Sequence, residues 1–213
     1  MNYKLFNGGN KISSQLGRSM VEMVGVLAIV GLLGIGGIAG YVKGSHQLRT
    51  NKLKDDISHL VANIRTVFLT QNNYQALSER MAIGTGIVPE DMISTDKQNI
   101  INRHKGSVFI KSAETIDDVN GAFIIIFNGL DSLTCQELLL ENWGSDIQTG
   151  FIGMTIKSDG DLTIETSSLV PHDFTSSEVT FRATDLQQNN VQRNYNVCNC
   201  GTANLCAIAW KFI

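Results

Sequence analysis

Proline and charge are each missing from long stretches of this 213-residue chain. It has two prolines, and neither falls between residues 18 and 70, so a single helix can run through that region. The formal net charge is −3 and the share of apolar residues is ordinary. This composition favours neither a disordered chain nor a basic face for nucleic acid. We therefore expect no nucleic-acid partner.

Recognisable catalytic motifs are missing as well. The chain contains no GxSxG nucleophile elbow, no P-loop and no HExxH zinc motif. The histidines are scattered in polar surroundings, which favours solvated side chains: His46, His59, His104 and His172. Adjacent acids such as Asp55-Asp56 and Glu90-Asp91 are typical of a solvated face or a helix start. We expect no enzyme activity, no cofactor and no metal site.

A single acid, Glu22, stands near the start of an apolar run at residues 20–42. As a helix these 23 residues are about 34 Å long, enough to cross a hydrocarbon core of about 30 Å. A carboxylate in a membrane segment costs at least ~2.5 kcal/mol near the bilayer centre and less near its edge, so it normally has a function and a partner charge. If the chain is cut between Gly17 and Arg18, the new α-amino group lies one helical turn from Glu22.

Two simpler interpretations of the N-terminus are open. A secretory signal peptide cut near Gly37 and Ala39 would leave a soluble product that starts near Tyr41. Its apolar core should be about 7 to 15 residues long and directly preceded by positive charge, whereas this run is longer and has an acid near its start. A plain single-span anchor explains the hydrophobicity but not the positions of Gly17 and Glu22.

The sequence GRSMVEM from Gly17, followed by VGVLAIVGLLGIGGIAGYVKG, resembles the class III leader and N-terminal helix of type IV pilins. The spacing of Gly17 and Glu22 is the specific part. The resemblance implies that a prepilin peptidase cuts after Gly17 and methylates the new N-terminus at Arg18, and that Glu22 assists docking into the growing fibre. Arg18 departs from the family, in which the first mature residue is commonly Phe, Met or Leu.

The likeness extends through the chain after Gly17 and is greatest to the type IVb pilins. It is carried by ANIRT from Ala62, QNNYQALS from Gln71, GIVPEDMI from Gly86, and C-terminal cysteines followed by an apolar strand. It implies a structural subunit that waits in a bacterial inner membrane and is then polymerised with other pilin subunits by the membrane assembly machinery into an extracellular pilus. The implied divisions are a leader at residues 1–17, a membrane and fibre-core half-helix at 18–42, and a globular domain at 43–213.

Hydrophobic periodicity predicts the elements of the globular part. Residues 43–70 read as an amphipathic helix with apolar positions three to four apart: Leu53, Ile57, Leu60, Val61, Ile64 and Phe68. A short helix is expected at residues 76–81, and a second is expected from the N-cap Asp131 to Trp143. Strands are predicted at residues 107–112, 122–127, 151–157, 161–166 and 205–213, with the third and fourth joined as a hairpin; residues 175–188 are ambiguous. This order favours an α+β fold in which an antiparallel sheet packs on the long N-terminal helix.

The four cysteines, Cys135, Cys198, Cys200 and Cys206, all follow the apolar run, where disulfides are permitted outside the cytoplasm. Cys198 and Cys200 are too close to bond each other in an extended chain. Full oxidation therefore pairs Cys135 with one of them and Cys206 with the other, and the spacing leaves both choices open. The competing four-thiolate zinc site lacks the two CxxC pairs that structural zinc usually uses. By resemblance, the Cys135 bond ties the C-terminal variable region to the sheet.

Other functions fit parts of this pattern. A minor pilin or a secretion pseudopilin would share the architecture but be present in few copies. A membrane-anchored binding protein or enzyme would work without polymerising. Abundance in sheared filaments separates the first pair from a major pilin, and activity of an unpolymerised chain would mark the second.

Overall fold

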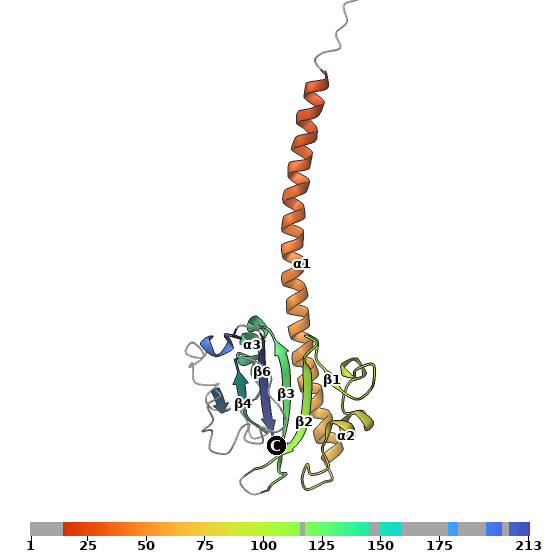
Figure 1. Cartoon of the computed structure of the whole chain (residues 1–213), viewed down its shortest axis with the longest axis vertical. Helices are drawn as coiled ribbons and strands as arrows, with labels where there is room; N and C mark the ends of the chain where they lie inside the picture. The colour runs from red at the N-terminus through yellow and green to blue at the C-terminus, as the bar shows by residue number, and fades with distance from the viewer. Residues whose placement is uncertain (1–14, 116–117, 145–149, 159–178, 183–194, 202–204) are drawn as a thin grey trace, which may run out of the picture. The chain divides into compact units, whose positions relative to one another are not determined.

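The structure is a computed structural model that describes residues 15–115, 118–144, 150–158, 179–182, 195–201 and 205–213 (Figure 1). The chain divides into two units, Met1–Gln47 and Leu48–Ile213, and each is described by itself. Helix α1, Gln15–Phe68, contributes its first part to one unit and its last part to the other.

In the first unit, α1 exposes its apolar side chains. Every residue from 20 to 44 is exposed, and the large apolar side chains between Met20 and Val42 keep 59% to 77% of their surface accessible. A helix that is apolar all round belongs in the core of a large protein or in a membrane. This segment also passes the length and composition test for a membrane span. The predicted uninterrupted helix is confirmed from residue 18 to residue 68.

In the second unit, the last five turns of α1 supply one side of the hydrophobic core. The buried positions recur every three or four residues, as predicted, and are at most 4% exposed: Leu53, Ile57, Leu60, Ile64 and Phe68. Val61 is only half-buried at the edge of this cluster. The helix face that carries the apolar stripe therefore packs inward, and the opposite face stays in water.

Within the described residues, six antiparallel strands form one sheet in the order β1-β2-β3-β6-β4-β5. Their bounds are β1 Ile100–Ile101, β2 Ser107–Ala113, β3 Ala122–Leu130, β4 Phe151–Lys157, β5 Val179–Arg182 and β6 Cys206–Phe212. Figure 1 shows β6, the last strand along the chain, between β3 and β4. The helix and the antiparallel sheet confirm the predicted α+β fold.

The alternation of side chains along β6 places it in two apolar layers. Ile208, Trp210 and Phe212 join the large core that includes the buried face of α1, together with the disulfide-bonded Cys206. Ala207 and Ala209 point to the other face and pack with residues of β3. All seven residues of β6 are buried. The predicted strand is therefore confirmed, and both of its faces are buried.

The strands predicted at residues 107–112, 122–127 and 151–157 are confirmed as β2, β3 and β4. The hairpin partner predicted at residues 161–166 lies outside the described residues. Along residues 153–156, β4 pairs with β6 on one edge and with β5 on the other. The ambiguous segment at residues 175–188 contains β5.

The two short α-helices begin and end where side chains meet backbone groups. Helix α2, Glu79–Gly84, starts later than predicted because Ser78 is its N-cap and accepts the Met81 N–H. Helix α3, Ser132–Leu139, begins after Asp131 as predicted. The prediction that it reaches Trp143 is wrong: the helix ends at Leu139, and the Trp143 indole folds back to donate to the Leu138 carbonyl at 2.8 Å. Short 3-10 helices occupy Glu90–Met92 (η1) and Tyr195–Cys198 (η2).

Candidate functional site

The N-terminal site predicted from the sequence lies on α1. Gly17 and Arg18 fall within its first turn, and Glu22 follows Arg18 by four residues, one turn further along. Glu22 is exposed, as is the apolar surface that follows it. The described chain stands alone, so the cleavage at Gly17 and Arg18 and the docking role of Glu22 stay predictions.

The exposed apolar surface of the first unit is the feature that most needs a partner. Monomeric soluble proteins rarely expose contiguous apolar patches larger than a few hundred Å². Here all the large apolar side chains between Met20 and Val42 are more than half exposed. Only lipid or other apolar helices can cover such a surface on every side.

The structure contains two disulfides, as predicted, and it shows which of Cys198 and Cys200 bonds Cys135. Cys135 bonds Cys198, and Cys200 bonds Cys206. All four residues are buried. The first bond joins α3 to η2, and the second fixes the entry to β6. Because every cysteine is used in a disulfide, the alternative four-thiolate zinc site is wrong.

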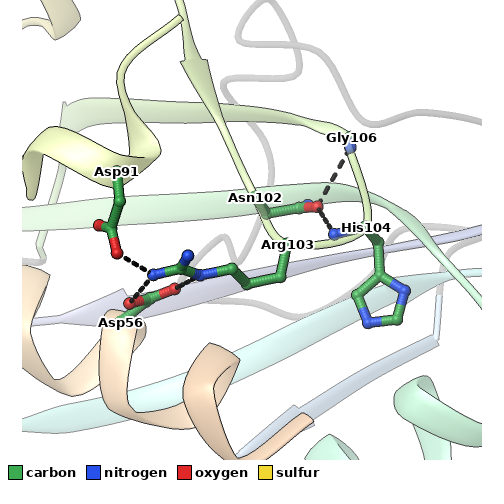
Figure 2. Close-up of polar contacts among 6 residues, drawn as sticks. All are labelled: Asp56, Asp91, Asn102, Arg103, His104 and Gly106. Carbon is green, nitrogen blue, oxygen red and sulfur yellow. Dashed lines mark hydrogen bonds and ion pairs between the residues drawn. The ribbon is translucent and has the colours of Figure 1, made fainter. Parts of the chain in front are cut away.

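A cluster of three charged side chains joins η1 and the β1–β2 turn to α1. Arg103, in the turn between β1 and β2, donates from Nε to Asp56 Oδ2 at 3.0 Å and from Nη2 to Asp56 Oδ1 at 3.5 Å. The same Nη2 also donates to Asp91 of η1. Figure 2 shows the guanidinium between the two carboxylates. One arginine thus holds η1 and the β1–β2 turn against a helix residue that lies 47 positions earlier in the sequence.

The charges of this cluster shift the acid–base equilibria of its members. The hydrogen bond from Arg103 is the largest effect that lowers the pKa of Asp91, and Lys52 adds a smaller electrostatic effect in the same direction. The hydrogen bond to Asp56 is the largest effect that raises the pKa of Arg103. Each shift favours the charged form of its group, so Asp91 and Arg103 stay ionised at neutral pH.

The sequence interpretation of these acids as a solvated face is wrong for Asp56, which is only 4% exposed. The sequence does contain a signal for the burial of Asp56. Asp56 lies three residues after Leu53 and four before Leu60, so helical periodicity places it on the buried stripe. An acid on a buried stripe needs a paired cation or several hydrogen bonds. Asp91 is half exposed yet takes part in the same cluster.

The backbone of the β1–β2 turn is fixed by Asn102, and this fixes Arg103. Asn102 Oδ1 accepts the N–H groups of His104 and Gly106, as Figure 2 shows, while its Nδ2 donates to the Asn128 carbonyl at 2.7 Å. A Cβ on Gly106 would lie 1.8 Å from that same carbonyl oxygen. Only glycine allows the turn to approach β3 this closely.

His104, Asp131 and Thr134 have the composition of a hydrolase triad, but their arrangement is that of a helix cap. His104 Nδ1 lies 3.3 Å from Asp131 Oδ2, and its Nε2 lies 3.4 Å from Thr134 Oγ1. Asp131 accepts both the Thr134 N–H at 2.8 Å and the Thr134 hydroxyl at 3.0 Å. Thr134 has no accessible surface, so a substrate cannot reach its hydroxyl. The cluster stabilises the start of α3, the helix that carries Cys135.

The ANIRT segment of α1 fastens the domain at two more places. Asn63 Nδ2 donates to the Ile87 carbonyl at 2.8 Å and so holds the loop before η1. Arg65 donates from Nε and Nη2 to the Ile213 carbonyl at 2.9 and 2.7 Å, and its guanidinium lies 5.8 Å from the centre of the Phe212 ring. Its charge also partly offsets the rise that burial causes in the pKa of Tyr74. The sequence pattern does not predict these contacts, because each joins α1 to a distant part of the chain.

The long helix and the antiparallel sheet form an α+β fold that is similar to a solved type IV pilin. The solved structure of TcpA, a type IV pilin from Vibrio cholerae El Tor biotype, is similar to this chain with a TM-score of 0.50 and 15% sequence identity. The match covers 78% of this chain and 99% of that one. It shows the fold and confirms the resemblance to type IV pilins.

Residues 47–199 match the family model described as PilS N terminal. The chain therefore belongs to the PilS family of pilins. No curated protein sequence matches it.

Proposed function

We propose that this chain is the precursor of a pilus subunit that is cut after Gly17 and polymerised through its apolar helix. The observation that carries the proposal is the helix at residues 20–42, apolar and exposed, with Glu22 one turn from the residue that the cut would make the new N-terminus. Membership of the PilS family supports the assignment as a pilin. The proposed parts are a leader at 1–17, a membrane and fibre-core half-helix at 18–42 and an external domain at 43–213.

Exchange of lipid for sister helices explains how such a subunit can leave a membrane. Burial of apolar surface contributes about 25 cal/mol per Å², so the apolar half-helix must be covered at every stage. Packing it against the same segment of neighbouring subunits keeps it out of water. A contact repeated head to tail without closing generates a filament rather than a ring.

Glu22 sets the register in this proposal. Its carboxylate pairs with the N-terminal amine of Arg18 in a neighbouring subunit, because an ion left alone in an apolar core is strongly unfavourable. A prepilin peptidase and the inner-membrane assembly machinery are the partners required. The subunit resides in the inner membrane before assembly and in the extracellular fibre afterwards.

The test compares three variants expressed in the producing bacterium. Gly17→Asp should keep residues 1–17, which the mass and N-terminal residue of the purified chain will reveal. Glu22→Val should mature normally but lose at least tenfold in sheared fibre. Asp55→Val, which removes an exposed acid elsewhere on the same helix, is the matched control and should keep normal yield. Normal fibre yield from Glu22→Val would contradict the docking role.

A further inference from the structure

Asparagine is followed by glycine at three places in the sequence, at residues 7–8, 120–121 and 128–129. Asparagine is a thermolabile residue, and a following glycine has no side chain to obstruct attack by its backbone nitrogen on the asparagine amide. The first pair lies outside the described residues, in the proposed leader. The other two belong to the second unit, one just before β3 and one inside it. The fold therefore places the same dipeptide in two different environments.

The Asn120 side chain is accessible and is not held in place. Asn120 is half-buried, and Val119 beside it keeps 75% of its surface exposed. Its backbone N–H donates to Asp118 Oδ1 at 2.9 Å, and its carbonyl accepts the Tyr74 N–H at 2.9 Å. Among the described residues, its side-chain amide makes no hydrogen bond. The Gly121 N–H donates to the Asp118 carbonyl at 3.3 Å, which is longer than a typical bond of this kind.

The environment of Asn128 is the opposite. This residue is 2% exposed, and its carbonyl accepts Asn102 Nδ2 at 2.7 Å. The β1–β2 turn packs directly on the pair, since a Cβ on Gly129 would lie 2.9 Å from Gly106 Cα. Attack on the amide requires the side chain and backbone to rotate toward each other, and the later hydrolysis requires water. A closely packed interior permits neither.

We propose that Asn120 is a site of spontaneous deamidation in the folded chain and that Asn128 is protected from it. The Gly121 nitrogen attacks the carbon of the Asn120 side-chain amide, a C–N bond closes a succinimide ring, and the amide nitrogen leaves as ammonia with the Gly121 proton. Water then opens the ring at either carbonyl and yields aspartate or isoaspartate. The first step is unimolecular, because both reacting groups belong to one dipeptide. The inference goes beyond the proposed function and does not depend on polymerisation.

The turn itself requires the glycine that makes Asn120 labile. A Cβ at position 121 would lie 2.5 Å from Thr115 Oγ1 and 3.1 Å from Asp118 Cβ. The Thr115 hydroxyl is held in that place, because it accepts the Asp118 N–H at 3.1 Å. A larger residue at position 121 would therefore slow deamidation only by disturbing the turn.

Deamidation would loosen a contact at the end of α1. Isoaspartate adds one methylene group to the backbone and so displaces the carbonyl that accepts the Tyr74 N–H. The Tyr74 ring lies 5.3 Å from the Phe68 ring and 4.9 Å from the Phe123 ring, so it joins the end of α1 to β3. The new carboxylate also repels that of Asp118, which accepts a hydrogen bond from the same residue.

The test incubates the full chain in detergent at mildly alkaline pH, where the attacking nitrogen loses its proton more readily. Mass spectrometry of proteolytic peptides measures the conversion of amide to acid at positions 120 and 128 separately. In the folded chain, Asn120 should convert at least about tenfold faster than Asn128. In urea the two rates should become similar, because the dipeptide is the same. Asn120→Gln should abolish conversion at position 120, and Asn51→Gln, at an exposed position on α1, should leave it unchanged.

Hydrogen exchange before and after incubation tests the effect on the Tyr74 contact. Peptides that cover residues 69–77 should exchange several-fold faster in the incubated intact chain, but not in incubated Asn120→Gln. Equal conversion of Asn120 and Asn128 in the folded chain would overturn the inference, as would conversion of Asn120 in urea alone. Unchanged exchange in a chain that is fully converted at position 120 would overturn the effect on the end of α1.

Discussion

Arg103 Nε lies 3.0 Å from Asp56 Oδ2, and this ion pair joins the β1–β2 turn to the buried face of α1. Asp56 is almost inaccessible, whereas the Arg103 side chain keeps about a quarter of its surface in water. The pair therefore sits at the edge of the core. It positions Arg103 so that the same guanidinium can also hold Asp91 and the loop that carries it.

Replacement of Asp56 should destabilise the domain more than replacement of its neighbour. Asp56→Ala leaves Arg103 without its more buried partner, and we expect a loss of about 2 to 3 kcal/mol. This is less than for a fully buried pair because Asp91 and water remain available. Asp55→Ala, at an exposed position on the same helix, should cost under about 0.5 kcal/mol. Urea unfolding of the full chain in detergent measures both, and equal losses would contradict the assigned role.

The ion pair of Asp91 makes part of the stability depend on acid. Its pKa is lower in the folded chain than in the unfolded one, chiefly because of the hydrogen bond from Arg103. The contribution is therefore fully present above the unfolded pKa of about 4 and is lost as the pH falls through the folded pKa. Asp91→Asn should be less stable than the intact chain at pH 7, and the difference should disappear in acid. A difference that stays constant with pH would show that the charge is not responsible.

Glycine is required at position 106 for steric reasons. In Gly106→Ala the new methyl group would meet the Asn128 carbonyl oxygen, and backbone must move to make room. We expect a loss of about 3 kcal/mol or more. Gly84→Ala is the matched control, because a Cβ at that position meets nothing within 4 Å. Thermal unfolding followed by circular dichroism compares the two, and similar melting temperatures would show that the turn can relax.

The two disulfides should contribute unequally. Cys135–Cys198 spans 63 residues of sequence and Cys200–Cys206 spans 6. In the chain-entropy account these loops correspond to about 4 and about 2 kcal/mol. Each disulfide is removed by a double substitution, Cys135→Ser with Cys198→Ser or Cys200→Ser with Cys206→Ser. Denaturant unfolding then compares the free energies of unfolding of the two variants. The reverse order would show that local packing around β6 outweighs loop length.

Much of the fold could be predicted because the patterns are local and strong. The run from Ala122 to Phe127 is continuous and apolar, and in the structure it forms part of a strand that is buried on both faces. The stripe from Leu53 to Phe68 predicted the inward face of α1. Asp131 is predicted as an N-cap because aspartate is preferred just before a helix, and the structure confirms it, since its carboxylate accepts the Thr134 N–H.

The differences from these predictions depend on contacts that the sequence pattern does not show. The prediction of a solvated Asp56 is wrong because the side chain is buried against Arg103, which is 47 residues away in the sequence. Helix α3 ends at Leu139, before the predicted Trp143, whose indole donates back to the Leu138 carbonyl. The choice between Cys198 and Cys200 depends on where η2 packs against α3, which spacing alone cannot give. The roles of Gly17, Arg18 and Glu22 involve other molecules and stay predictions.

The central place of β6 affects how the domain can be made. Residues 206–212 leave the ribosome after every other strand, yet they are the neighbours that β3 and β4 both require. Until they arrive, two apolar strands have open edges on which foreign strands can pair. Synthesis therefore passes through a stage in which most of the chain has been made and its sheet is still in two halves.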